Sequence, residues 1–185
     1  SQMFTAIDSV PLTAIAFFML TGELMTSATI TDRLVALSRA LIGRIRGGLA
    51  QVNVLVSMFF AGMNGSVVAD TATVGALVLP AMKKAGYPAA FSAAVTGVSS
   101  TIGGIIPPSI MMIVLANATE ISIASLFAAG IVPGILIGVV IMVINHYFAV
   151  KHNFERSDEP FSVRRAGKEL YRSSFALLIP VVLLG

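Results

Sequence analysis

The chain has 185 residues, of which 56% are hydrophobic and 11% are charged, with a formal net charge of +3 and no cysteine. A soluble domain usually carries about 25% charged residues, so the composition excludes a soluble enzyme, a disordered segment and a nucleic-acid-binding protein. It predicts an all-α, polytopic membrane protein whose apolar surface faces lipid or other membrane helices.

The first apolar run covers residues 9–22, and a segment of different character follows at residues 31–46. In this segment arginines lie mostly opposite an apolar face that recurs at helical spacing. The apolar face comprises Leu34, Leu37, Leu41 and Ile45. The pattern predicts a basic amphipathic helix that lies in the membrane interface or braces its neighbours, which we favour over a calmodulin-type target. We therefore expect residues 1–46 to form a scaffold helix and an amphipathic arm.

Lysine and arginine occur in only three clusters, at residues 33–46, 83–84 and 151–172. The positive-inside rule favours all three clusters on the cytoplasmic face of the membrane. Each apolar block between two clusters must then leave and return on the same side.

The block at residues 47–82 has 36 residues, whereas two full membrane spans need about 40. Helix-breaking residues stand near its middle, in Gly62-Met-Asn-Gly-Ser66. This pattern predicts a re-entrant helical hairpin whose tip lies inside the membrane, buried in protein or lining a wet cavity.

The block at residues 85–119 must cross once, because residues 121–150 are predicted to form one long tilted span. As a straight helix its 35 residues would measure about 52 Å, which exceeds a membrane core of about 30 Å. Paired glycines and paired prolines interrupt it between Ser99 and Ser109. The block is therefore predicted to be a discontinuous transmembrane helix.

Residues 120–185 are expected to hold a scaffold span, a cytoplasmic loop and the start of a further helix. Along the span, small residues repeat every four positions at Gly130, Gly134 and Gly138, which predicts close helix packing.

Two broken elements at membrane depth leave free carbonyls and half-helix ends, a pattern typical of transporter binding sites. A hard cation would take oxygen ligands there, and no histidine or cysteine cluster exists for a transition metal. The candidate side chains are Asn64, Ser66, Ser99, Ser100 and Thr101.

Asp70 is the one ionisable residue within residues 47–82. A carboxylate inside a membrane is costly and marks a functional site by default. We favour a role for Asp70 in an ion site, as a ligand or as a support for the ligands, over simple capping of the second hairpin helix.

Four ordered motifs resemble those of the large membrane subunit of tripartite ATP-independent periplasmic (TRAP) transporters, the DctM type. They are Gly62-Met-Asn-Gly-Ser-Val-Val-Ala-Asp-Thr-Ala-Thr-Val-Gly75, Leu79-Pro-Ala-Met-Lys-Lys-Ala-Gly-Tyr87, Ser99-Ser-Thr-Ile-Gly-Gly-Ile-Ile-Pro-Pro-Ser109 and Leu126-Phe-Ala-Ala-Gly-Ile-Val-Pro-Gly134. The resemblance implies the first half of an inverted-repeat, elevator-type transporter, and we expect the second repeat to lie outside this chain. Residues 47–119 would then be transport-domain elements.

The resemblance also implies a non-enzymatic permease of the bacterial inner membrane that imports organic acids, such as C4-dicarboxylates or sialic acid, on a sodium gradient. Its partners would be a small membrane subunit, a periplasmic substrate-binding protein, the organic acid and the lipid bilayer, without nucleic acid. No cofactor is implied other than sodium as the coupling ion.

Carried onto this sequence, the resemblance implies two groups of site residues. The sodium site would comprise Asn64, Gly65, Ser66, Asp70, Ser99, Ser100, Thr101 and Gly103. The segment facing the substrate would contain Gly104, Pro107, Pro108 and Ser109.

Two alternatives stay open at this point. An intramembrane hydrolase would use Ser66 or Asp70, but it needs a base or a second carboxylate within reach, and both histidines lie near a membrane end. A purely structural membrane subunit without a bound ion is the other.

Overall fold

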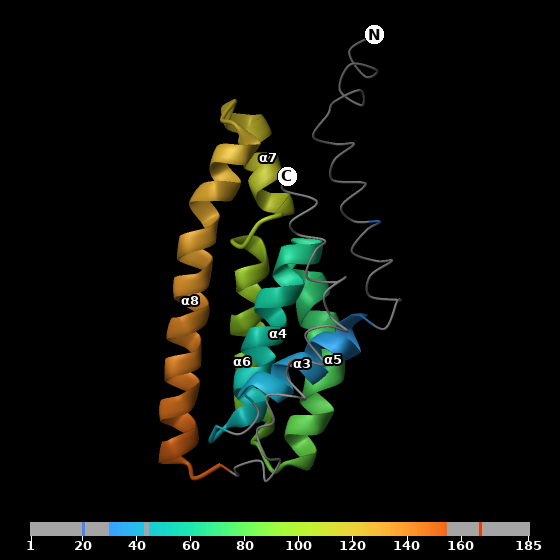
Figure 1. Ribbon diagram of the computed structural model, residues 1–185, viewed down its shortest axis with the longest axis vertical. Helices are drawn as coiled ribbons and strands as arrows, with labels where there is room; N and C mark the ends of the chain where they lie inside the picture. Colours follow the sequence, from blue (N-terminus) through green and yellow to red (C-terminus); the bar gives the residue numbers. More distant parts are fainter. Residues whose placement is uncertain (1–19, 21–29, 43–44, 155–166, 168–185) are drawn as a thin grey trace.

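A computed structural model describes residues 20, 30–42, 45–154 and 167. This part of the chain is built from helices and contains no strand, which confirms the all-α class. Nearly all of the first apolar run, most of the third basic cluster and the final residues 168–185 lie outside it. The elements, drawn in Figure 1, are α3 (Ile30–Ile42), α4 (Gly48–Asn64), α5 (Val67–Lys84), α6 (Ala89–Ser100), the 3-10 helix η1 (Thr101–Gly104), α7 (Ile110–Thr119) and α8 (Ile123–Lys151).

The predicted helical hairpin is formed by α4 and α5, and only Gly65 and Ser66 separate the two helices. Gly65 takes a left-handed conformation with φ of 58°, and its N–H donates to the Ala61 carbonyl. Ser66 begins α5, because its Oγ accepts a hydrogen bond from the Ala69 N–H at 3.3 Å. The turn is thus made by the glycine and serine that interrupt the apolar pattern.

The predicted interruption at residues 99–109 also forms. After α6 the chain tightens into η1 and then runs without helix to Ser109, where α7 begins. Ser109 Oγ accepts from the Met112 N–H at 3.4 Å and donates to the Gly104 carbonyl at 2.9 Å. These bonds hold both ends of the break together.

Helix α8 is long and apolar enough to cross a membrane, and it is the one such helix in the described part of the chain. Its three spaced glycines contact the break and the hairpin. A Cβ on Gly130 would lie 2.5 Å from the Ile105 carbonyl oxygen, one on Gly134 would lie 2.5 Å from Ile106 Cγ1, and one on Gly138 would lie 2.5 Å from Met58 Sδ. The prediction of close helix packing through these glycines is confirmed.

The amphipathic helix is shorter than predicted. Leu34 and Leu37 are buried, but α3 ends at Ile42, and Leu41 and Ile45 are 42% and 41% exposed. Ile45 belongs to the turn that leads into α4 through Gly47, whose φ is 73°. The turn takes this residue off the helical face, so a pattern of 3.6 residues per turn no longer applies to it.

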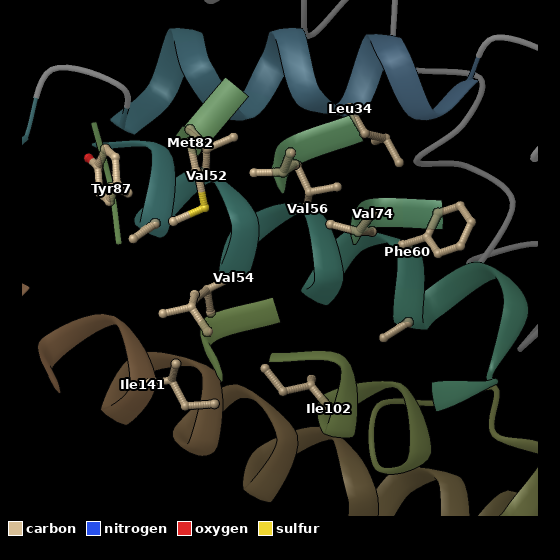
Figure 2. Close-up of a cluster of buried hydrophobic side chains, with 14 of the residues drawn as sticks. Leu34, Val52, Val54, Val56, Phe60, Val74, Met82, Tyr87, Ile102 and Ile141 are labelled. Atoms are coloured by element: carbon tan, nitrogen blue, oxygen red, sulfur yellow. The ribbon is translucent and has the colours of Figure 1, made fainter. Parts of the chain in front are cut away.

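Helix α4 lies at the centre of the fold, with α3, α5, α6 and α8 around it. Figure 2 shows its side chains extending in several directions, with Leu34 and Val74 on one side and Ile102 and Ile141 on the other. The α4 residues in this core include Val52, Val54, Val56 and Phe60, all fully buried. Burial on nearly every face explains why α4 is mostly apolar, and it also encloses the polar side chains of Gln51, Asn53 and Ser57.

Candidate ion and substrate site

The tip of the hairpin contacts the break in the second element. The Ile110 N–H donates to the Gly65 carbonyl at 3.3 Å. A Cβ at Gly65 would collide with the Pro108 carbonyl oxygen, and a Cβ at Gly103 would lie 3.7 Å from the backbone of Ser66. Two segments about 40 residues apart in the chain therefore meet backbone to backbone, and glycine at position 65 is what permits it.

Helices α5 and α7 both begin at this contact, and each has a serine at its N-cap. The N-terminus of a helix carries a partial positive charge and unpaired N–H groups, which attract anions. The contact therefore brings together two helix N-termini, whose partial positive charge can attract a carboxylate.

Asn64 lies beside the same contact, with 4% of its surface exposed. Its Oδ1 accepts a hydrogen bond from the Ser66 N–H at 3.1 Å, which sets the orientation of the amide. Its Nδ2 is buried without a hydrogen-bond partner in the described part of the chain. The free end of this side chain is therefore a donor.

Asp70 lies in the first turn of α5 and is fully buried. The hydroxyl groups of Ser57 and Ser100 face its carboxylate. Within the described part of the chain, neither carboxylate oxygen forms a short, well-aligned hydrogen bond with them. The cap of α5 is Ser66 and not Asp70, so the capping interpretation of Asp70 is wrong.

A polar network that the sequence motifs did not reveal lies next to Asp70, between α4 and α6. The Asn53 Nδ2 donates to Thr96 Oγ1 at 2.7 Å, and Ser99 Oγ donates to Asn53 Oδ1 at 3.3 Å. Ser57 Oγ in turn donates to Ser99 Oγ at 3.3 Å. The sequence feature that could have indicated this network is the spacing of Asn53 and Ser57, which lie four residues apart on one face of the helix.

The predicted site residues thus fall into two neighbouring groups. Ser99 and Ser100 lie with Asp70, whereas Asn64, Ser66 and the glycines line the contact between hairpin tip and break. Gly104 lies against Val67, and the buried residues Pro107, Pro108 and Ser109 complete the break. Thr101 differs from the others, because its side chain is exposed and its Oγ1 donates to the Val98 carbonyl at 2.7 Å.

The sequence is similar to those of several known transporter permeases. The chain is 36% identical over 184 residues to the sialic acid TRAP transporter large permease protein of Vibrio cholerae. The matched region covers 100% of this chain and 43% of that relative. The chain is 39% identical over 184 residues to the C4-dicarboxylate TRAP transporter large permease protein of Pseudomonas aeruginosa, with the same shares. It is 38% identical over 185 residues to the sialic acid TRAP transporter permease protein of Haemophilus influenzae, covering 100% of this chain and 30% of the relative.

The chain therefore spans less than half the length of these relatives. All three are named as transporter permeases, which confirms that the chain is not an enzyme and removes the hydrolase alternative. Residues 1–185 match the family described as the tripartite ATP-independent periplasmic transporter, DctM component. The chain belongs to this family of TRAP transporter permeases.

Proposed function

We propose that the chain is part of the large permease subunit of a transporter that imports organic acids across the bacterial inner membrane on a sodium gradient. The observation that carries this proposal is the fully buried Asp70 carboxylate, whose polar neighbours in the described part of the chain are the uncharged hydroxyls of Ser100 and Ser57. A buried charge without a partner is strongly unfavourable. A bound cation offsets that cost.

The chemistry of the surrounding groups favours a hard cation. Asp70, Ser57 and Ser100 offer a carboxylate and two hydroxyl oxygens, the ligand type that such ions prefer. The described residues contain no group of three or more histidine, cysteine or acidic side chains that would suit a transition metal. Sodium is the coupling ion that we propose.

An organic acid is the proposed substrate because the adjoining contact offers donors. A carboxylate can accept hydrogen bonds from the N-terminal N–H groups of α5 and α7 and from the free Nδ2 of Asn64. Relatives are named for sialic acid and for C4-dicarboxylates, both of which carry carboxylates. We therefore propose Asn64 as a substrate contact through its amide N–H₂, with Gly104, Pro107, Pro108 and Ser109 beside it.

The two bound species are coupled by charge. Asp70 lies in the first turn of α5, so its bare carboxylate repels an anion at the N-terminus of the same helix. A cation beside Asp70 removes that repulsion. We propose that the cation binds first and makes the substrate site attractive.

The basic residues support a cytoplasmic position for one end of the molecule. The C-terminal ends of α5 and α8, with Lys84 and Lys151, lie at the same end in Figure 1. Arg46 joins them there, since its Nη1 donates to Asn153 Oδ1 at 3.1 Å. We propose that this end faces the cytoplasm, that α8 spans the membrane and that the hairpin re-enters it from the cytoplasmic side.

For transport we propose an elevator-type movement of residues 47–119 against a scaffold that includes residues 1–46. The contacts of Gly130 and Gly134 with the break support grouping the adjoining part of α8 with the moving elements, and not with the scaffold first expected for residues 120–185. A small membrane subunit and a periplasmic substrate-binding protein are the proposed partners.

The test is uptake of a labelled organic acid into proteoliposomes that contain the intact permease with its partners. We expect uptake by the wild type to require an inward sodium gradient. We expect the Asp70→Asn variant to lose concentrative uptake and to show no response to sodium. Asp32→Asn, at an exposed carboxylate on α3, is the matched control and should behave as the wild type. Unchanged uptake on a potassium or proton gradient alone would contradict the proposal.

A further inference from the structure

The groups around Asp70 come from three different helices. Asp70 lies on α5, Ser57 on α4 and Ser100 on α6. A cation site of this kind depends on the spacing of the helices, because an ion binds well only when its oxygen ligands lie at the correct distances. A residue that fixes this spacing would therefore control the affinity for the cation.

Asn53 bridges all three helices. It is fully buried on α4, and its Nδ2 donates to Thr96 Oγ1 on α6 at 2.7 Å and contacts Met82 Sδ on α5 at 3.8 Å. Its Oδ1 lies 3.3 Å from Ser99 Oγ on α6, a hydroxyl that can donate to it or to the Thr96 carbonyl at 3.1 Å. Both ends of the amide are thus engaged inside the protein, where such bonds are costly to lose.

The same network reaches the two serines that face Asp70. Ser57 Oγ donates to Ser99 Oγ at 3.3 Å, and Ser100 Oγ donates to the Thr96 carbonyl at 2.8 Å. These contacts fix the two hydroxyl groups next to Asp70 relative to α4 and α6.

We propose that Asn53 is a positioning residue for the coupling cation: by bridging α4 to Thr96 and Ser99 it sets the spacing of Ser57 and Ser100 around Asp70. This inference rests on the proposed cation coupling. According to this inference, Asn53 controls the affinity for the cation and the discrimination between sodium and lithium, although it does not contact the ion.

Gln51 provides the matched control. It is another buried amide on α4, with 2% of its surface exposed, and its Nε2 donates to the Met142 carbonyl of α8 at 2.8 Å. Gln51 and Asn53 are two residues apart and so lie on different sides of the helix. A general loss of helix packing would affect both variants, whereas a loss of positioning would affect only Asn53.

The experiment measures uptake by the intact, reconstituted permease as a function of sodium concentration, with the lithium-to-sodium ratio as a second readout. Asn53→Leu should raise the half-saturating sodium concentration about tenfold and change the rate at saturating sodium less than about twofold. Thr96→Val should change it in the same direction by a smaller factor. Gln51→Leu should leave it within about twofold of the wild type.

The inference would be overturned if Asn53→Leu left the half-saturating sodium concentration unchanged. It would also be overturned if Gln51→Leu raised that concentration as much as Asn53→Leu does. If Asn53→Leu does not yield folded protein, the near-isosteric Thr96→Val decides, since it removes the same hydrogen bond. Sodium-independent uptake by the wild type would instead refute the proposed function, and the inference with it.

Discussion

Gly65 shows how much the site depends on single residues. It combines a left-handed backbone, with φ of 58°, and direct contact with the backbone of Pro108 and Ser109. Each requirement alone favours glycine, and together they strongly disfavour any side chain. Gly86 has the first property without the second, because its φ is 78° and nothing lies within 4 Å of an added Cβ.

This pair allows a residue-scale prediction. Gly86→Ala should cost about 1 kcal/mol, the strain of a left-handed alanine. Gly65→Ala should cost about 3 kcal/mol or more, because overlap with rigid backbone is added to the strain. Thermal unfolding of the intact permease in detergent measures both. Equal losses in the two variants would show that the contact between tip and break is not tight.

The polar residues were only partly predictable at this scale. Asn64, Ser66 and Asp70 stand out because they interrupt apolar sequence near helix breakers. Asn53, Ser57 and Thr96 lie within regular helices, where the sequence shows which side chains share a face but not which neighbouring helix that face meets. Thr101 was predicted as part of the sodium site, and the sequence alone did not reveal that its hydroxyl bonds to the preceding helical turn.

At the scale of elements, the hairpin and the broken helix were predicted because their causes are local. Gly65 and Ser66 end one helix and start the next, and the paired glycines and paired prolines between Thr101 and Ser109 do not continue the α-helix of α6. The end of α3 was predicted less well. The left-handed turn at Gly47 redirects the chain, and the apolar pattern gives no sign of it.

The glycines of α8 yield an element-scale prediction. Gly130 faces the backbone carbonyl of Ile105, whereas Gly138 faces the flexible side chain of Met58. Alanine adds about 1 kcal/mol of helix propensity at either position, but only at Gly138 can the neighbour move aside. We expect Gly130→Ala to destabilise by about 2 kcal/mol and Gly138→Ala to stay within about 1 kcal/mol of the wild type.

Unfolding temperatures of the two variants check the order. Gly97→Ala is the control, because position 97 lies in a helix with nothing within 4 Å of an added Cβ. A larger loss in Gly138→Ala than in Gly130→Ala would contradict the packing of α8 on the break.

At the scale of the whole molecule, the described fold separates two kinds of chemistry. Basic residues gather at the end formed by Lys84, Arg46 and Lys151, while Asp70 and the contact between tip and break lie buried away from them. The net charge of +3 therefore says more about orientation in a membrane than about an acidic partner. Cation binding at Asp70 is the central claim that follows from this arrangement.

The most direct test is equilibrium binding of radioactive sodium to the purified intact permease. The wild type should bind sodium saturably, Asp70→Asn should not, and Thr101→Val should bind as the wild type, because the Thr101 hydroxyl bonds to the preceding helical turn. Absence of saturable binding in the wild type, or wild-type binding by Asp70→Asn, would contradict a cation site at the junction of α4, α5 and α6.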